Sequence, residues 1–71
     1  MASLAEELPN EIDRVRRLQD EFKELRRMPN VIVEPQIMMM EGAIQGATRA
    51  LASGDVVEMI RQYEHLKTFT E

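Results

Sequence analysis

The stretch that decides the fold is residues 47–66, ATRALASGDVVEMIRQYEHL, in which a glycine and an aspartate stand between two helical patterns. Gly54 is the residue expected just past the end of one helix, because glycine readily adopts the left-handed conformation that ends many helices. Asp55 suits the N-cap of the next helix, and Glu58 three residues later completes a pattern that resembles a capping box. The connection is therefore very short, and we predict an antiparallel helical hairpin.

The two helices of this hairpin are predicted at about residues 35–53 and 55–69. The earlier helix begins at a proline, which is tolerated in a first helical turn. The later helix has apolar residues at helical spacing on one face: Val56, Met59, Ile60, Tyr63 and Leu66. Both helices therefore have a face to bury.

The helix at 35–53 has apolar and small residues over an arc of roughly 200°, about twice what a surface helix needs to face one core. Two neighbours are therefore expected. Its two interior glycines each cost about 1 kcal/mol relative to alanine, so they call for a structural reason. That reason is either a close helix crossing between subunits or close packing against the first helix of the same chain. The candidate residues for an oligomer interface are Met39, Gly42, Ala43, Gly46 and Ala50.

Three consecutive methionines, Met38, Met39 and Met40, also lie in this helix. Methionine is unbranched and polarizable, so it fills irregular gaps in a core, and the same property suits an adaptable binding groove. Consecutive helical residues cannot all face one way, and Met38 falls on the polar side of the helix. Both interpretations stay open at this point.

A further helix is predicted at about residues 9–28, starting at a proline and ending before Pro29. Its apolar residues share one face: Ile12, Val15, Leu18, Phe22 and Leu25. Residues 1–8 are predicted to form a frayed lead before a single helical domain of residues 9–71. The β-branched run at 31–33 is short and flanked by prolines, which favours an extended connector over a strand.

The small size of the chain predicts homo-oligomerisation. A chain of 71 residues is marginally stable alone, and without cysteine it has no disulfide to help it. We therefore expect the three-helix, all-α fold to be completed by association of identical chains. The absence of cysteine also favours the cytoplasm. No apolar signal segment or membrane span is predicted.

Charge limits the partners that we expect. The formal net charge of −4 disfavours generic nucleic-acid binding, which depends on cations that neutralise phosphates. The candidates for binding an anion are the arginines of the first helix, Arg16, Arg17, Arg26 and Arg27, whose planar guanidinium groups suit phosphate. Alternatively, these side chains only solvate the helix through i,i+4 pairs: Asp13 with Arg17, Arg16 with Asp20, and Arg17 with Glu21.

Catalysis and metal binding are not expected. Nucleophilic catalysis needs an activated side chain, and the chain has no cysteine and a single histidine, His65, on a helix flank. The carboxylates are spread along the helices without the E-x-x-H spacing of a helical metal site. We therefore predict a protein that is not an enzyme and holds no metal or cofactor.

Two resemblances bear on function. Residues 47–67 resemble the helix junction of one tetratricopeptide repeat, although no second copy follows and a solenoid needs about three. From Leu8 onwards, the chain resembles short α-helical proteins of bacteriophages and prophages. The resembling parts are the LPNEI motif at 8–12, the methionine-containing central helix and the SGDVV motif at 53–57 with the residues that follow it.

The resemblance to phage proteins implies an accessory protein that acts by binding. We expect it to block or sequester a host factor, for example in antiviral defence, either as an inhibitor of a host protein or as a sponge for a small nucleotide signal. The alternative is a structural or assembly adaptor, or a helical oligomerisation module. The expected partners are thus a second copy of the chain and a host protein or small nucleotide. Binding to a membrane is not expected.

Overall fold

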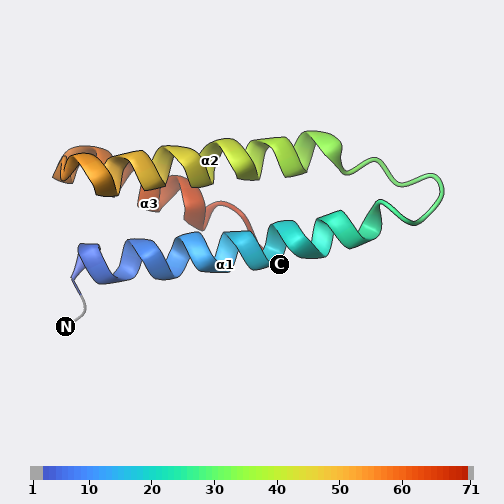
Figure 1. Cartoon of the computed structure of the whole chain (residues 1–71), viewed down its shortest axis with the longest axis horizontal. Helices are drawn as coiled ribbons and strands as arrows, with labels where there is room; N and C mark the ends of the chain where they lie inside the picture. The colour runs from blue at the N-terminus through green and yellow to red at the C-terminus, as the bar shows by residue number, and fades with distance from the viewer. Residues whose placement is uncertain (1–2, 71) are drawn as a thin grey trace.

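The computed structural model describes residues 3–70 and contains three helices. They are α1 (Leu4–Leu25), α2 (Glu34–Ser53) and α3 (Val56–Lys67). In Figure 1, α1 and α2 lie side by side along the length of the molecule, and α3 folds back from the end of α2. No residue from 3 to 70 is in a strand. The predicted all-α fold with a hairpin of the last two helices is therefore confirmed.

The turn between α2 and α3 forms as predicted. Gly54 has the left-handed φ of 71°, and its N–H donates to the Ala50 carbonyl at 3.1 Å. The Asp55 carboxylate accepts from the backbone N–H groups of Val57 and Glu58, at 3.1 and 3.3 Å. The capping box itself does not form, because the Asp55 N–H donates to the Ser53 hydroxyl at 3.2 Å. Backbone and side chain together thus stop one helix and start the next within two residues.

The first helix begins at Leu4, five residues before the predicted start at Pro9. Leu8 is fully buried and Leu4 is half-buried against the core, so both gain from a helix that continues N-terminally. Pro9 leaves the carbonyl of Ala5 without its usual helical donor, but Ala5 is exposed and water can satisfy it. Burial of the leucines therefore overrides the proline, so residues 4–8 belong to α1, whereas residues 1 and 2 of the predicted lead lie outside the described residues.

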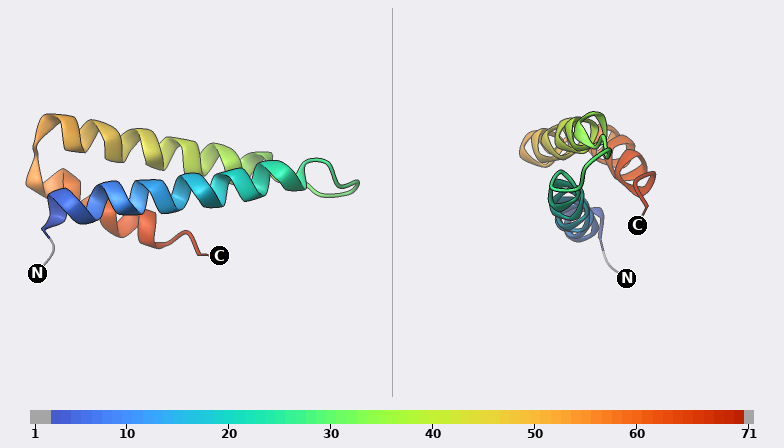
Figure 2. Two further views of the ribbon diagram at one scale, coloured as in Figure 1. Left: turned by 60° about the horizontal axis from the view of Figure 1, so that its bottom comes forward. Right: turned by 90° about the vertical axis from the view of Figure 1, so that its right-hand side faces the viewer.

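The core lies where the three helices face one another. Its most buried large side chains are Leu8, Val15, Met40, Ile44 and Leu66, each less than 2% exposed. Past the end of α3, Phe69 is 5% exposed and belongs to the same cluster. Seen end-on in the right-hand view of Figure 2, the three helices surround a common centre. Each contributes a face to one continuous core.

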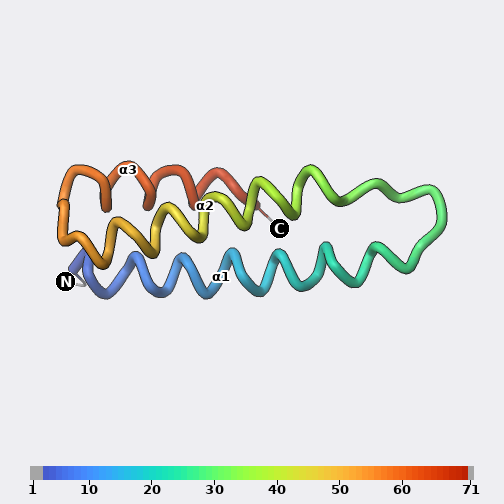
Figure 3. The backbone as a smooth tube through the Cα atoms, turned by 45° about the horizontal axis from the view of Figure 1, so that its top comes forward, coloured from blue at the N-terminus to red at the C-terminus, as the bar shows by residue number. Residues whose placement is uncertain are grey.

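The molecule has a thick half and a thin half. It is elongated, with extents of 42 × 21 × 16 Å. α3 has 12 residues whereas α1 has 22 and α2 has 20, so α3 reaches only part of the way along its neighbours. Figure 3 shows α3 beside the hairpin half of α2, and only α1 and α2 in the other half. The thin half ends in the α1–α2 loop, residues 26–33.

Candidate functional site

Exposed apolar side chains gather around the α1–α2 loop. Of the nine large hydrophobic residues that are exposed within residues 3–70, six lie between positions 25 and 39. We call the four at the loop the apolar tip: Leu25, Met28, Val31 and Ile32. Ile32 is 87% exposed and Met28 is 54% exposed. Four exposed apolar residues within eight positions of one another favour a binding site, whereas single exposed residues are common everywhere.

The loop that carries the tip is fastened at both ends. Arg26, just after α1, pairs with Glu34 at the start of α2, and its Nη2 donates to a Glu34 oxygen at 2.9 Å. Val33 is only 5% exposed and anchors the loop to the helices. Asn30 adopts a left-handed φ of 68°, which asparagine tolerates better than most residues. The exposure of Ile32 therefore belongs to a constrained turn.

The methionine run lies partly in the core and partly on the surface. Met40 is 1% exposed and belongs to the core, whereas Met38 and Met39 are 71% and 58% exposed. The predicted extended connector at 31–33 likewise alternates, with Ile32 outside and Val33 inside. In both segments, neighbouring residues of similar type therefore differ in whether they lie in the core or on the surface.

The four predicted anion-binding arginines do not meet at one place within the chain. Arg26 pairs with Glu34, and Arg27 pairs with Glu24 at 3.5 Å. Arg16 and Arg17 make no ion pair within residues 3–70, and the three expected i,i+4 pairs do not form there. They lie about 15 Å along α1 from Arg26 and Arg27, since a helix rises 1.5 Å per residue. Only different subunits could bring the two groups together.

Three of the five residues predicted for an oligomer interface have neighbours within their own chain. Ala43 and Ala50 are 3% and 5% exposed and belong to the core. A Cβ added to Gly46 would meet the Gln62 side-chain oxygen of α3 at 2.9 Å. The glycine thus makes room for Gln62 of α3 rather than for α1. Met39 and Gly42 remain exposed.

A polar bridge between α1 and α2 was not foreseen from the sequence. Gln19 is 4% exposed, and its amide donates to the Ile37 carbonyl at 3.3 Å and to Glu41 Oε1 at 3.0 Å. These contacts lower the pKa of Glu41: the hydrogen bond from Gln19 contributes most, followed by that from Gln45 at 3.2 Å. The only sequence signal was a glutamine inside the apolar face of α1. The bridge holds the two long helices in register where α3 does not reach.

A second link joins α1 to the end of α3. Arg14 Nη2 donates to the Leu66 carbonyl at 2.9 Å and also pairs with Glu11 at 3.1 Å. A cation near a helix C-terminus interacts favourably with the helix dipole, and the Leu66 carbonyl also accepts from the Phe69 N–H at 3.2 Å. The arginine thus links the end of α3 to α1.

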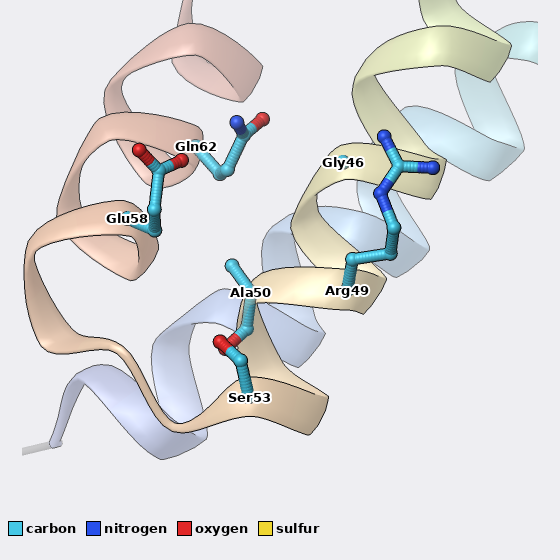
Figure 4. Close-up of a pocket in the computed structure, with 6 residues that line it drawn as sticks. All are labelled: Gly46, Arg49, Ala50, Ser53, Glu58 and Gln62. Atoms are coloured by element: carbon cyan, nitrogen blue, oxygen red, sulfur yellow. The ribbon is translucent and has the colours of Figure 1, made fainter.

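A shallow pocket of about 240 Å³ lies between α2 and α3 near the hairpin (Figure 4). Figure 4 shows Glu58 and Gln62 on α3 and Arg49 on the α2 side. The remaining lining residues are Gly46, Ala50 and Ser53. Glu58 is paired with Arg61 at 2.8 Å, and Arg49 makes no ion pair within residues 3–70. The pocket is polar, open and small.

Other kinds of site find little support in the part of the chain described. No three His, Asp or Glu side chains within residues 3–70 are grouped so that they could hold a metal ion. None of the helices in that range combines the length and apolar character needed to cross a bilayer. The exposed His65 lies against the ring of Phe69, with the ring centres 5.6 Å apart.

Comparison with known proteins finds no match: no family model, no curated protein and no solved structure matches this chain.

Proposed function

We propose that this chain is a non-enzymatic binding protein that receives a partner protein on its apolar tip. The observation that supports the proposal is the 87% exposure of Ile32 on a loop fastened by Arg26, Val33 and Glu34. Leaving large apolar side chains in water is unfavourable, by about 25 cal/mol for each Å² that a partner could cover. A constrained loop also loses little conformational entropy on binding.

The tip suits an apolar or amphipathic segment of a protein. Two ion pairs, Arg27–Glu24 and Arg26–Glu34, involve residues next to the tip, so its surroundings are polar and carry both charges. Interfaces commonly combine a polar rim with an apolar centre. In keeping with the resemblance to phage proteins, the proposed role is that of an accessory protein that blocks a host protein, for example one that acts in antiviral defence.

The proposal is tested by replacing Ile32 with glutamate. Partner capture from lysate of bacteria that are hosts of bacteriophages is compared for wild type, Ile32→Glu and the control Val57→Glu. Val57 is 62% exposed on α3, so the control makes the same kind of change at the opposite end of the molecule. One stoichiometric protein should be captured by wild type and Val57→Glu and lost with Ile32→Glu. Loss with both variants, or with neither, would contradict a binding role for the tip.

A sponge for nucleotide signals is the second candidate, because Arg16 and Arg17 are exposed and free of ion pairs within residues 3–70. Phosphate would be bound by guanidinium groups from more than one subunit. A panel of cyclic dinucleotides and ADP-ribose compounds should then raise the melting temperature of wild type, but not of a variant with both arginines changed to alanine. No shift at saturating ligand would remove this candidate. Presence in purified virions would instead favour an adaptor.

A further inference from the structure

One stripe of α2 is exposed along the length of the helix. Its residues are separated by three, four, three and four positions, and all are exposed: Pro35, Met38, Gly42, Gln45 and Arg49. We call them the outer stripe. Alternation of three and four residues is the spacing of a seam between two packed helices. Arg49 is its only ionised residue, although charged residues make up 31% of the chain.

The centre of the outer stripe has no explanation within one chain. A Cβ added to Gly42 would find nothing within 4 Å, so neither α1 nor α3 requires a glycine there. Gly46 differs, because a Cβ there would meet Gln62. An exposed glycine in the middle of a helix lowers stability relative to alanine. The absence of a side chain at Gly42 is useful if another backbone approaches it closely.

From this we infer that a second copy of the chain packs on the outer stripe, with the two α2 helices antiparallel and crossing at Gly42 on a twofold axis. Homodimers commonly have such an axis, which makes one surface complementary to itself. With Gly42 at the axis, each residue that precedes Gly42 in one copy lies level with the residue that follows Gly42 by the same number of positions in the other copy. Met38 of one copy then lies level with Gly46 of the other, and Pro35 lies level with Arg49.

The pocket beside the stripe fits this register. Met38 is 71% exposed, and its counterpart position, Gly46, lies on the wall of the 240 Å³ pocket between α2 and α3. A flexible methionine can enter a shallow opening of irregular shape. Two such insertions, related by the axis, would cover both exposed Met38 side chains. The apolar tip, which precedes the start of α2, is not part of this seam.

Charge selects the antiparallel orientation. In a parallel pair, Arg49 of each copy would lie beside Arg49 of the other, and like charges side by side repel. In the antiparallel pair the two arginines are about 21 Å apart along the axis, given 1.5 Å per residue. Each arginine would instead lie near Glu34 of the other copy, whose side chain is 56% exposed. The antiparallel orientation of the two copies is therefore the one that the charges favour.

The first test replaces Gly42 with lysine. Sedimentation should show a dimer for wild type and for the control Asn10→Lys, which adds the same charge at an exposed position of α1. Gly42→Lys should weaken the dimer by about tenfold or more, because a charge is forced into the seam. Its helix content should not fall, since a side chain at 42 meets open space within the chain. A wild type that stays monomeric over the micromolar range, or a Gly42→Lys variant that dimerises as wild type does, would overturn the inference.

The second test measures orientation with single cysteines, which is straightforward because the chain has none. A disulfide forms only when the two Cα atoms are within about 7 Å. On oxidation, Gly42→Cys should give a covalent dimer. Met38→Cys should not, because the two positions lie about 12 Å apart along the axis of an antiparallel pair. Rapid cross-linking of Met38→Cys would overturn the antiparallel register. These tests use purified protein alone, so they are independent of whether the tip binds a partner.

Discussion

The three glycines of the chain should respond differently to the same substitution, because each has a different environment. Gly42→Ala should raise the free energy of unfolding by about 1 kcal/mol, since alanine favours the helix and the new Cβ meets nothing within 4 Å. For a domain of this size, about 1 kcal/mol corresponds to roughly 4–8 °C in melting temperature. The expected change is therefore a clear rise in the melting temperature.

Gly46→Ala should have little net effect. The helix gains about the same 1 kcal/mol, but the new Cβ would lie 2.9 Å from Gln62 Oε1 and 3.2 Å from its Cδ. The Gln62 side chain must then move, and leaving its favoured rotamer costs about 0.5–1.5 kcal/mol. Because the atoms in the way are the end of a flexible side chain, the two effects should nearly cancel.

Gly54→Ala should be destabilising. Gly54 has a φ of 71°, and a side chain in the left-handed region costs roughly 1–2 kcal/mol. All three variants can be compared by thermal unfolding followed by circular dichroism, at concentrations low enough that the melting temperature no longer depends on concentration. The expected order of melting temperatures is Gly42→Ala, then Gly46→Ala close to wild type, then Gly54→Ala. A lower melting temperature for Gly42→Ala at such dilution would refute the open space assigned to position 42 within one chain.

Two further predictions concern the core and the polar bridge. Leu66 is fully buried, so Leu66→Ala should lower the free energy of unfolding by about 2–5 kcal/mol, and an unchanged denaturant midpoint would contradict its place in the core. The pKa of Glu41 is lowered from 4.5 in the folded state, so its carboxylate stabilises the fold above that pH, and the stabilisation is lost as the pH falls through the folded pKa. Wild type should therefore melt above Glu41→Gln at pH 7, with a gap that narrows below pH 4.5, and a gap that widens in acid would be inconsistent with this.

Local signals in the sequence were sufficient for the number of helices and for the hairpin. Gly54 and Asp55 act on their nearest neighbours, so their effect on the backbone can be predicted without knowing what the helices pack against. The start of α1 could not be predicted in this way, because it depends on the burial of Leu8 against other helices. A signal was present, since Leu4, Leu8 and Ile12 recur at intervals of four and extend the apolar face past Pro9.

The surfaces were harder to predict than the helices. The small residues of α2 suggested one oligomer interface, but Ala43, Gly46 and Ala50 have neighbours within the chain and Gly42 does not. The bridge joins Gln19 and Glu41, which are 22 positions apart in the sequence, so it depends on how α1 and α2 are aligned along their lengths. Neither feature follows from helix periodicity alone.

The thick and thin halves separate stability from the proposed binding. The third helix adds its buried side chains, Met59 and Leu66, to the core only in the hairpin half, whereas the α1–α2 loop with Ile32 lies at the far end. Covering the thin half with a longer α3 would bury more apolar surface and stabilise the chain alone, but it would reach toward the loop that carries the tip. A short third helix therefore leaves the tip accessible, and the Gln19–Glu41 bridge and the Arg26–Glu34 pair supply polar links where no third helix packs. Substitutions at Ile32 should consequently change binding with little change in melting temperature.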